Sequence, residues 1–166
     1  MVAMASSGAA RVTLPADTEI LITREFAAPK HLVYKAWTTP ELVKRWWAGQ
    51  RGTVTSAQID LRVGGMWRYV MVAHGGFEVA FHGTYREIVP EERIVTTEVY
   101  EMPGAPDGEG VLNIVTFTEI NGRTTLSLLA QCSSKEERDA IMGSGMEGGM
   151  QEGMDLLEQV AISLAK

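Results

Sequence analysis

Apolar and polar residues alternate along most of the chain between residues 20 and 132, the period-two pattern of half-buried β-strands. Short turn signals separate the alternating segments, among them Gly64-Gly65, Gly75-Gly76, Pro90 and Asn121-Gly122, and a longer loop is predicted from Pro103 to Gly110. Successive short connections favour an antiparallel meander. The predicted strands cover residues 20–26, 53–61, 66–73, 77–89, 93–101, 112–119 and 124–132.

Helical signals occur after the first strand and at the end of the chain. Pro29 begins a short predicted helix over 29–37, and Thr39 with Pro40 begins a second one that runs through Trp47. Ser134 and Glu137 have the spacing of a capping box, which opens a helical pattern to about residue 165. Glycines at 143 and 145 are expected to bend this last helix, because glycine disfavours helix interiors.

The last helix carries two apolar stripes at four-residue spacing, which place their members on neighbouring faces. A methionine stripe forms an adaptable apolar wall, and a glycine stripe permits close approach. Ordinary core packing would produce the same pattern. The stripes consist of Met142, Met146, Met150 and Met154, and of Gly145, Gly149 and Gly153.

Together these elements predict an α+β fold in which a curved antiparallel sheet of six to seven strands surrounds the long C-terminal helix. The sheet needs an apolar cover, and this helix is the only long element available to provide it. A length of 166 residues suits one domain, which we place at 17–166 after a disordered tail over 1–16.

Strand alternation predicts which side chains face the helix and line a cavity beside it. On two strands the apolar face is clear, whereas both faces of 77–89 and 93–101 mix polar and apolar residues. Trp47, at the end of the second short helix, is a further candidate for contact with a ligand in the cavity. The inward residues expected from the strands are Trp67, Tyr69, Met71, Phe81, Tyr85, Asn113, Val115 and Phe117.

Glu98 and Asn113 are the polar residues most interesting for chemistry in such a cavity. Burial raises the pKa of a carboxyl group, which is how an apolar pocket produces a general acid or base. Glu98 is therefore the one candidate catalytic residue. The alternative is that Glu98 is exposed or paired with Arg86 or Arg93.

Charge and composition exclude several other functions. The net charge of −6 and the absence of a basic run disfavour nucleic acid as a partner. Cys132 is the only cysteine, and no apolar run reaches the length of a membrane span, so we expect a cytoplasmic protein. We expect neither a metal nor a cofactor, because the three histidines are scattered and the Gly-x-Gly-x-x-Gly at 143–148 follows helical sequence.

Several blocks of the sequence, in order, resemble the family of activator-of-Hsp90-ATPase homologues. This resemblance spans roughly residues 20–165 and implies the helix-grip fold of the START-like superfamily, with a ligand cavity. Glycines at 148 and 153 depart from the family pattern, which suggests an adaptable final helix. The blocks are REFAAP at 24–29, AWTTPEL at 36–42, WW at 46–47, GGMWRYVM at 64–71, GTYREIVPEERIV at 83–95, ERD at 137–139 and SGME at 144–147.

Three functions follow as hypotheses. The first is binding of a hydrophobic or aromatic small molecule in the cavity, for sequestration, transport or sensing. The second is an enzyme resembling polyketide cyclases or dehydratases, with Glu98, Tyr69 or Tyr85 as acid or base. The third is stimulation of a chaperone ATPase, but the family's chaperone activators carry a further N-terminal domain, so we do not expect a chaperone partner. A homodimer is left open.

Overall fold

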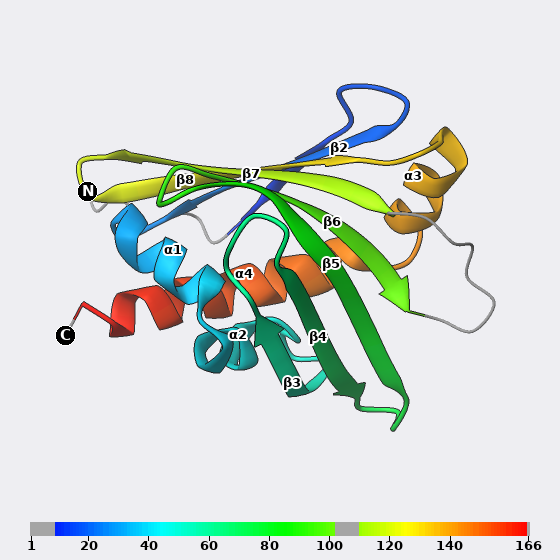
Figure 1. Cartoon of the computed structure of the whole chain (residues 1–166), viewed down its shortest axis with the longest axis horizontal. Coiled ribbons are helices and arrows are strands. Elements are labelled where there is room, and N and C mark those ends of the chain that lie inside the picture. Colours follow the sequence, from blue (N-terminus) through cyan, green and yellow to red (C-terminus); the bar gives the residue numbers. More distant parts are fainter. Residues whose placement is uncertain (1–8, 102–109, 166) are drawn as a thin grey trace.

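A sheet of eight antiparallel strands curves around one long helix in the computed structural model, which describes residues 9–101 and 110–165 (Figure 1). The strand order across the sheet is β1-β2-β8-β7-β6-β5-β4-β3. The strands are β1 (Arg11–Thr13), β2 (Glu19–Phe26), β3 (Gly52–Ile59), β4 (Met66–Ala73), β5 (Glu78–Val89), β6 (Arg93–Glu101), β7 (Val111–Ile120) and β8 (Arg123–Gln131). The helices are α1 (Lys30–Thr38), α2 (Pro40–Trp46), α3 (Lys135–Met142) and α4 (Met146–Ser163).

This architecture confirms the predicted α+β helix-grip fold, with one strand more than the six to seven expected. The additional strand is β1, which pairs with β2 through Val12 opposite Ile22. Residues 11–13 therefore correct the prediction of a disordered tail over 1–16, of which residues 1–8 lie outside the described part. Of the loop predicted from Pro103 to Gly110, only Gly110 is described.

Tight turns connect the central strands as their residue types predict. Asn121 and Gly122 join β7 to β8 with φ values of 53° and 76°. Two consecutive positive φ angles are the geometry of a type I′ hairpin turn, which Asn-Gly adopts readily. This turn fixes the register in which Leu126 lies opposite Phe117.

The final helical segment is interrupted between Met142 and Met146. The N–H of Glu137 donates to Ser134 Oγ over 3.0 Å and caps α3. Gly145 then adopts φ 85°, a left-handed conformation suited to glycine, and α4 starts anew in a different direction. The bend predicted at the two glycines is thus a complete break.

The larger core between the sheet and α4 lies at one end of the molecule. Phe26, Val33, Leu126 and Leu157 are fully buried there, where α1 also covers the sheet. Within α4, the buried residues begin at Gly153, although the helix starts seven residues earlier. The first turns of α4 are less deeply buried, with Met146 and Met150 packed against a small core around Ile20 and Ile22.

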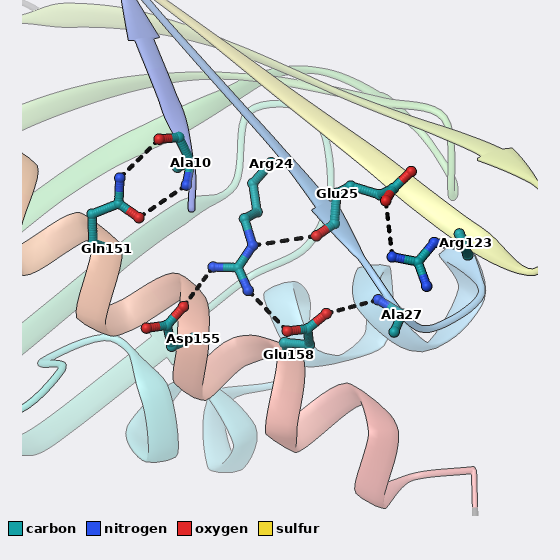
Figure 2. Close-up of polar contacts among 8 residues, drawn as sticks. All are labelled: Ala10, Arg24, Glu25, Ala27, Arg123, Gln151, Asp155 and Glu158. Carbon is teal, nitrogen blue, oxygen red and sulfur yellow. Dashed lines mark hydrogen bonds and ion pairs between the residues drawn. The ribbon is translucent and has the colours of Figure 1, made fainter. Parts of the chain in front are cut away.

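Ion pairs and hydrogen bonds hold α4 against β2 and against Ala10 (Figure 2). The buried Arg24 guanidinium donates from Nη1 to Asp155 Oδ1 over 2.8 Å and from Nη2 to Glu158 Oε1 over 2.9 Å. The other oxygen of Glu158 accepts the Ala27 N–H over 2.8 Å. One turn earlier, the Gln151 amide binds both the N–H and the carbonyl of Ala10, over 2.9 and 2.8 Å. These contacts define the height of α4 above the sheet.

Candidate functional site

A cavity of about 1120 Å³ lies between the inner face of the sheet and the N-terminal half of α4. Strands β2 and β4 to β8 form one wall, α3 and α4 form the other, and the end of α2 closes part of the side. The cavity opens where its lining residues are exposed: Phe77 and Tyr100 are 61% and 43% accessible, and Ser144 and Gly145 at the start of α4 are also exposed. The site is therefore an interior space with a mouth, bounded by rigid strands and one helix.

The structure shows which residues of β5 and β6 face the cavity, the two strands on which the sequence pattern was ambiguous. On β5 the odd-numbered residues from Val79 to Tyr85 face inward, including Phe81 and Tyr85 as predicted. On β6 the even-numbered residues face inward, including Glu98 and the unpredicted Thr96. The predicted residues that line the cavity are Trp47, Trp67, Tyr69, Met71, Phe81, Tyr85, Glu98, Asn113, Val115, Met146, Met150 and Met154.

Two predicted cavity residues lie elsewhere. Phe117 has the expected facing on β7, but α1 covers that end of the strand, and the Phe117 ring packs against Tyr34 and Trp37 with centroids 5.5 and 6.4 Å apart. Met142 belongs to α3, before the helix break, and packs in the small core around Ile20 and Ile22. Neither residue lines the cavity, so both assignments are corrected.

Aromatic rings form one continuous wall of the cavity. Trp47, which directly follows α2, contacts Tyr69 and Phe81 edge-to-face with centroids 5.4 and 5.6 Å apart. Tyr69 also contacts Trp67 at 4.8 Å, and Phe81 stacks on Tyr100 at 5.0 Å. Such edge and stacked contacts hold each ring in one orientation. The wall presents rigid, flat apolar surface to the cavity.

Gly83 lets the Trp67 indole lie flat across the sheet. The indole N–H reaches past Gly83 on β5 and donates to the Thr97 carbonyl on β6 over 3.1 Å. A Cβ at Gly83 would come within 1.8 Å of that carbonyl oxygen and 2.6 Å of the indole nitrogen. The absence of a side chain at residue 83 is thus required for the position of Trp67.

Glu98 and Asn113 form a polar pair on the cavity wall. Asn113 Nδ2 donates to Glu98 Oε1 over 2.9 Å. Burial raises the pKa of the Glu98 carboxyl, and the Asn113 hydrogen bond opposes that rise. The side chain of Glu98 is partly accessible, but only toward the cavity that it lines. Of the two arginines considered as partners, Arg93 pairs with Glu87 over 3.0 Å.

The hydroxyl groups of Tyr69 and Tyr85 are open to the cavity. Neither makes a hydrogen bond to another residue in the described ranges, and no side-chain oxygen there is both sealed from solvent and without a partner. Each hydroxyl therefore keeps accessible surface on the cavity side. Burial raises the pKa of both phenols far above the neutral range, so they stay protonated and can donate.

Arg51, which the sequence analysis did not single out, lies across the glycine stripe of α4 at the cavity mouth. A Cβ at Gly148 would come within 2.6 Å of Arg51 Nη2, and one at Gly149 within 3.7 Å of Nε. Arg51 Nε also faces Glu152 Oε1 at 3.4 Å. Only at Gly148 would a Cβ require the Arg51 guanidinium to shift, a contact that helical spacing alone does not reveal.

The outer face of the sheet carries a separate charge network. Arg68 binds Glu101 with two hydrogen bonds of 2.9 and 2.8 Å, and His82 Nδ1 contacts the same carboxylate at 2.8 Å. The Arg68 hydrogen bonds, followed by that of His82, lower the pKa of Glu101 to about 2. Arg68 is therefore an outward charge, as its alternation predicts, and takes no part in the cavity.

Within residues 9–101 and 110–165, no group of three or more His, Cys, Asp or Glu side chains is arranged to hold a metal ion. The helices in those ranges are all too short or too polar to cross a membrane.

Comparison with known proteins agrees with the fold. The family model for activator of Hsp90 ATPase homolog 1-like proteins matches residues 27–161. A crystal structure from Rhodobacter sphaeroides is 23% identical, with a TM-score of 0.83 over 93% of this chain and 99% of the other. One from Chromobacterium violaceum is 26% identical, with a TM-score of 0.76 over 88% and 98% of the two chains.

A solution structure of an AHSA1-like protein from Aeromonas hydrophila is 20% identical, with a TM-score of 0.64 over 87% of this chain and 94% of the other. No curated protein sequence matches the chain. The family model covers most of the chain, from the end of β2 into the last turns of α4. The chain therefore belongs to the activator of Hsp90 ATPase homolog 1-like family.

Proposed function

We propose that the protein binds a hydrophobic or aromatic small molecule in the cavity between the sheet and α4. The observation that carries this proposal is the cavity itself, about 1120 Å³ in volume and lined mainly by apolar side chains. Ligand pockets in proteins typically measure about 300–1,000 Å³ and combine apolar walls with a few polar groups. The cavity is large enough for a ligand of several fused rings or a folded acyl chain.

The cavity has an aromatic wall and a methionine wall, which we expect to contact different parts of the ligand. The aromatic rings on β4, β5 and β6 are held by one another and offer a fixed surface. The methionines of α4 are unbranched and adapt to the shape of what lies against them. Met146, Met150 and Met154 therefore support binding of ligands that differ in outline on one side and share a flat body on the other.

One observation favours a second candidate, an enzyme resembling polyketide cyclases or dehydratases. The carboxyl of Glu98 has its pKa raised by burial and lies on the cavity wall, as a general acid or base would. Such an enzyme would convert its ligand, and Glu98→Gln would abolish turnover while leaving binding measurable. A protein that only binds its ligand has no turnover for this substitution to abolish.

Titration with N-phenyl-1-naphthylamine, a neutral dye that fluoresces in apolar surroundings, tests the binding proposal. We expect saturable fluorescence in the unchanged protein. Met150→Trp should weaken binding at least about tenfold, or about 1.4 kcal/mol, because the larger ring occupies the cavity. Met142→Trp is the matched control, since Met142 lies outside the cavity, and should change the affinity less than about threefold.

Equal effects of the two tryptophans, or the absence of saturable dye binding, would contradict the proposal. Circular dichroism of both variants establishes that each remains folded. Conversion of a bound molecule that depends on Glu98 would instead favour the enzyme.

A further inference from the structure

The cavity contains a carboxyl group that no cation balances among residues 9–101 and 110–165. Asn113 occupies Glu98 Oε1, and Oε2 has no hydrogen-bond partner among residues 9–101 and 110–165. Since no side-chain oxygen there is both sealed and unpartnered, Oε2 keeps surface that faces the cavity. Outside these ranges the one side-chain cation of the sequence is Lys166, which follows the C-terminal end of α4, whereas the cavity lies beside the N-terminal half of that helix.

The other charged residues on the cavity lining already have partners. Arg51 faces Glu152 at 3.4 Å. Glu137 accepts hydrogen bonds from the N–H and the hydroxyl of Ser133 over 2.7 and 3.1 Å. Among the charged residues of the cavity lining, Glu98 is therefore the one with a carboxylate oxygen, Oε2, that can accept a hydrogen bond from a ligand.

Register places aromatic rings on both sides of this carboxyl. Trp67 pairs with Gly83, and the pairs His82–Val99 and Tyr85–Thr96 set Gly83 opposite Glu98. Because Gly83 has no side chain, the Trp67 indole lies over it, next to Glu98 in the same row. The adjoining row consists of Tyr69, Phe81 and Tyr100, in cross-strand register. Side chains in neighbouring rows of one face lie within about 7–8 Å of each other.

A carboxylate beside aromatic faces is the environment that an organic cation prefers. The ring faces attract a positive charge, and the carboxylate supplies its counter-charge in a region of low dielectric. The net charge of −6 adds a field that draws cations toward the protein. An anionic ligand would be repelled by the ring faces, by the Glu98 carboxylate and by the net negative charge of the protein.

We propose that the ligand is an organic cation, an apolar or aromatic molecule whose protonated amine or quaternary ammonium lies between Glu98 Oε2 and the rings of Trp67 and Tyr69. This inference rests on the proposed binding function and specifies the ligand class of the same cavity. The apolar body extends toward the methionines of α4, and the charged end lies against the sheet. Asn113 orients the carboxylate and is a positioning residue.

A matched pair of competitors tests the inference by displacement of N-phenyl-1-naphthylamine. Naphthalen-1-ylmethylamine is cationic at neutral pH, whereas naphthalen-1-ylmethanol has the same ring and a neutral hydroxyl. We expect the amine to bind at least about tenfold more tightly than the alcohol. Glu98→Gln should remove that preference by weakening the amine at least about tenfold while changing the alcohol less than about threefold. Glu136→Gln, which removes one exposed negative charge from α3, is the matched control.

The outcomes separate this inference from the function on which it rests. Equal displacement by both compounds, or tighter binding of the alcohol, would overturn the cation while the binding function stands. Absence of dye binding would overturn both. The comparison on the unchanged protein decides the ligand class even where Glu98→Gln fails to fold, because it requires no variant. An amine preference that survives in folded Glu98→Gln would also overturn the assignment.

Discussion

Gly83 shows how one residue without a side chain shapes the binding wall. It lies under the Trp67 indole, opposite Glu98, where the sheet would otherwise carry a side chain on its inner face. The indole N–H thereby satisfies the Thr97 carbonyl, and the Thr97 hydroxyl accepts the Thr84 N–H over 2.9 Å. Local hydrogen bonding and the position of the aromatic wall are thus coupled at this residue.

Gly83→Ala should destabilise the protein by about 2–3 kcal/mol, because the new methyl group would clash with backbone and displace Trp67. Urea unfolding measures the change. Gly143→Ala is the matched control, since Gly143 has φ −82° and a Cβ there would come no closer than 3.4 Å to another atom. It should leave the protein unchanged or about 1 kcal/mol more stable. Equal stability of the two variants would refute the role of Gly83.

The sequence predicts the facing of single residues well wherever a strand has one clear apolar side. Trp67, Tyr69 and Met71 on β4 all line the cavity as alternation requires. Phe117 fails because alternation gives the face of a residue but not which part of that face α1 covers. Arg51 was missed because its contact with Gly148 joins a loop to a helix almost a hundred residues away.

The two parts of α4 serve different purposes. Its second part packs into the core and is tied to β2 by Arg24 (Figure 2). Its first turns carry Met146, Gly149 and Met150, which line the cavity. Anchoring at one end leaves the other less deeply packed, with Met146 and Met150 only partly buried against the sheet. The helix therefore acts as both a core element and a cavity wall.

Replacement of Arg24 by methionine should lower the free energy of unfolding by about 3–5 kcal/mol, because it removes one partner from a buried charge cluster. Arg123→Met is the matched control. Arg123 pairs with the half-exposed Glu25 at the surface, so its loss should cost less than about 1 kcal/mol. Chemical denaturation compares the two, and similar losses would show that the Arg24 cluster does not anchor α4.

Elements with strong local signals are predicted correctly, and elements formed by distant pairing are not. Gly145 marks the interruption before α4, because it adopts the left-handed backbone that favours glycine. Strand β1 has no comparable signal. It forms because the edge of β2 offers unpaired backbone groups and Gln151 binds Ala10, neither of which is encoded near residues 11–13.

The whole molecule is a curved sheet closed at one end by α1 and the core part of α4. Closure at one end alone leaves the cavity and its mouth at the other. The family and fold follow from the sequence, but the size of the cavity does not, since it depends on how far the tethers of Gln151 and Arg24 hold α4 from the sheet. Membership in a family named for chaperone activation does not determine what occupies this space.

A crystal structure of the protein with bound N-phenyl-1-naphthylamine is the most direct test of whether a small molecule binds between the sheet and α4. It locates the ligand without reliance on any variant. We expect electron density for the dye between the aromatic wall and α4, in contact with Tyr69 and Met150. Dye bound on the outer face of the sheet, with the cavity filled only by water or by rearranged side chains, would contradict it.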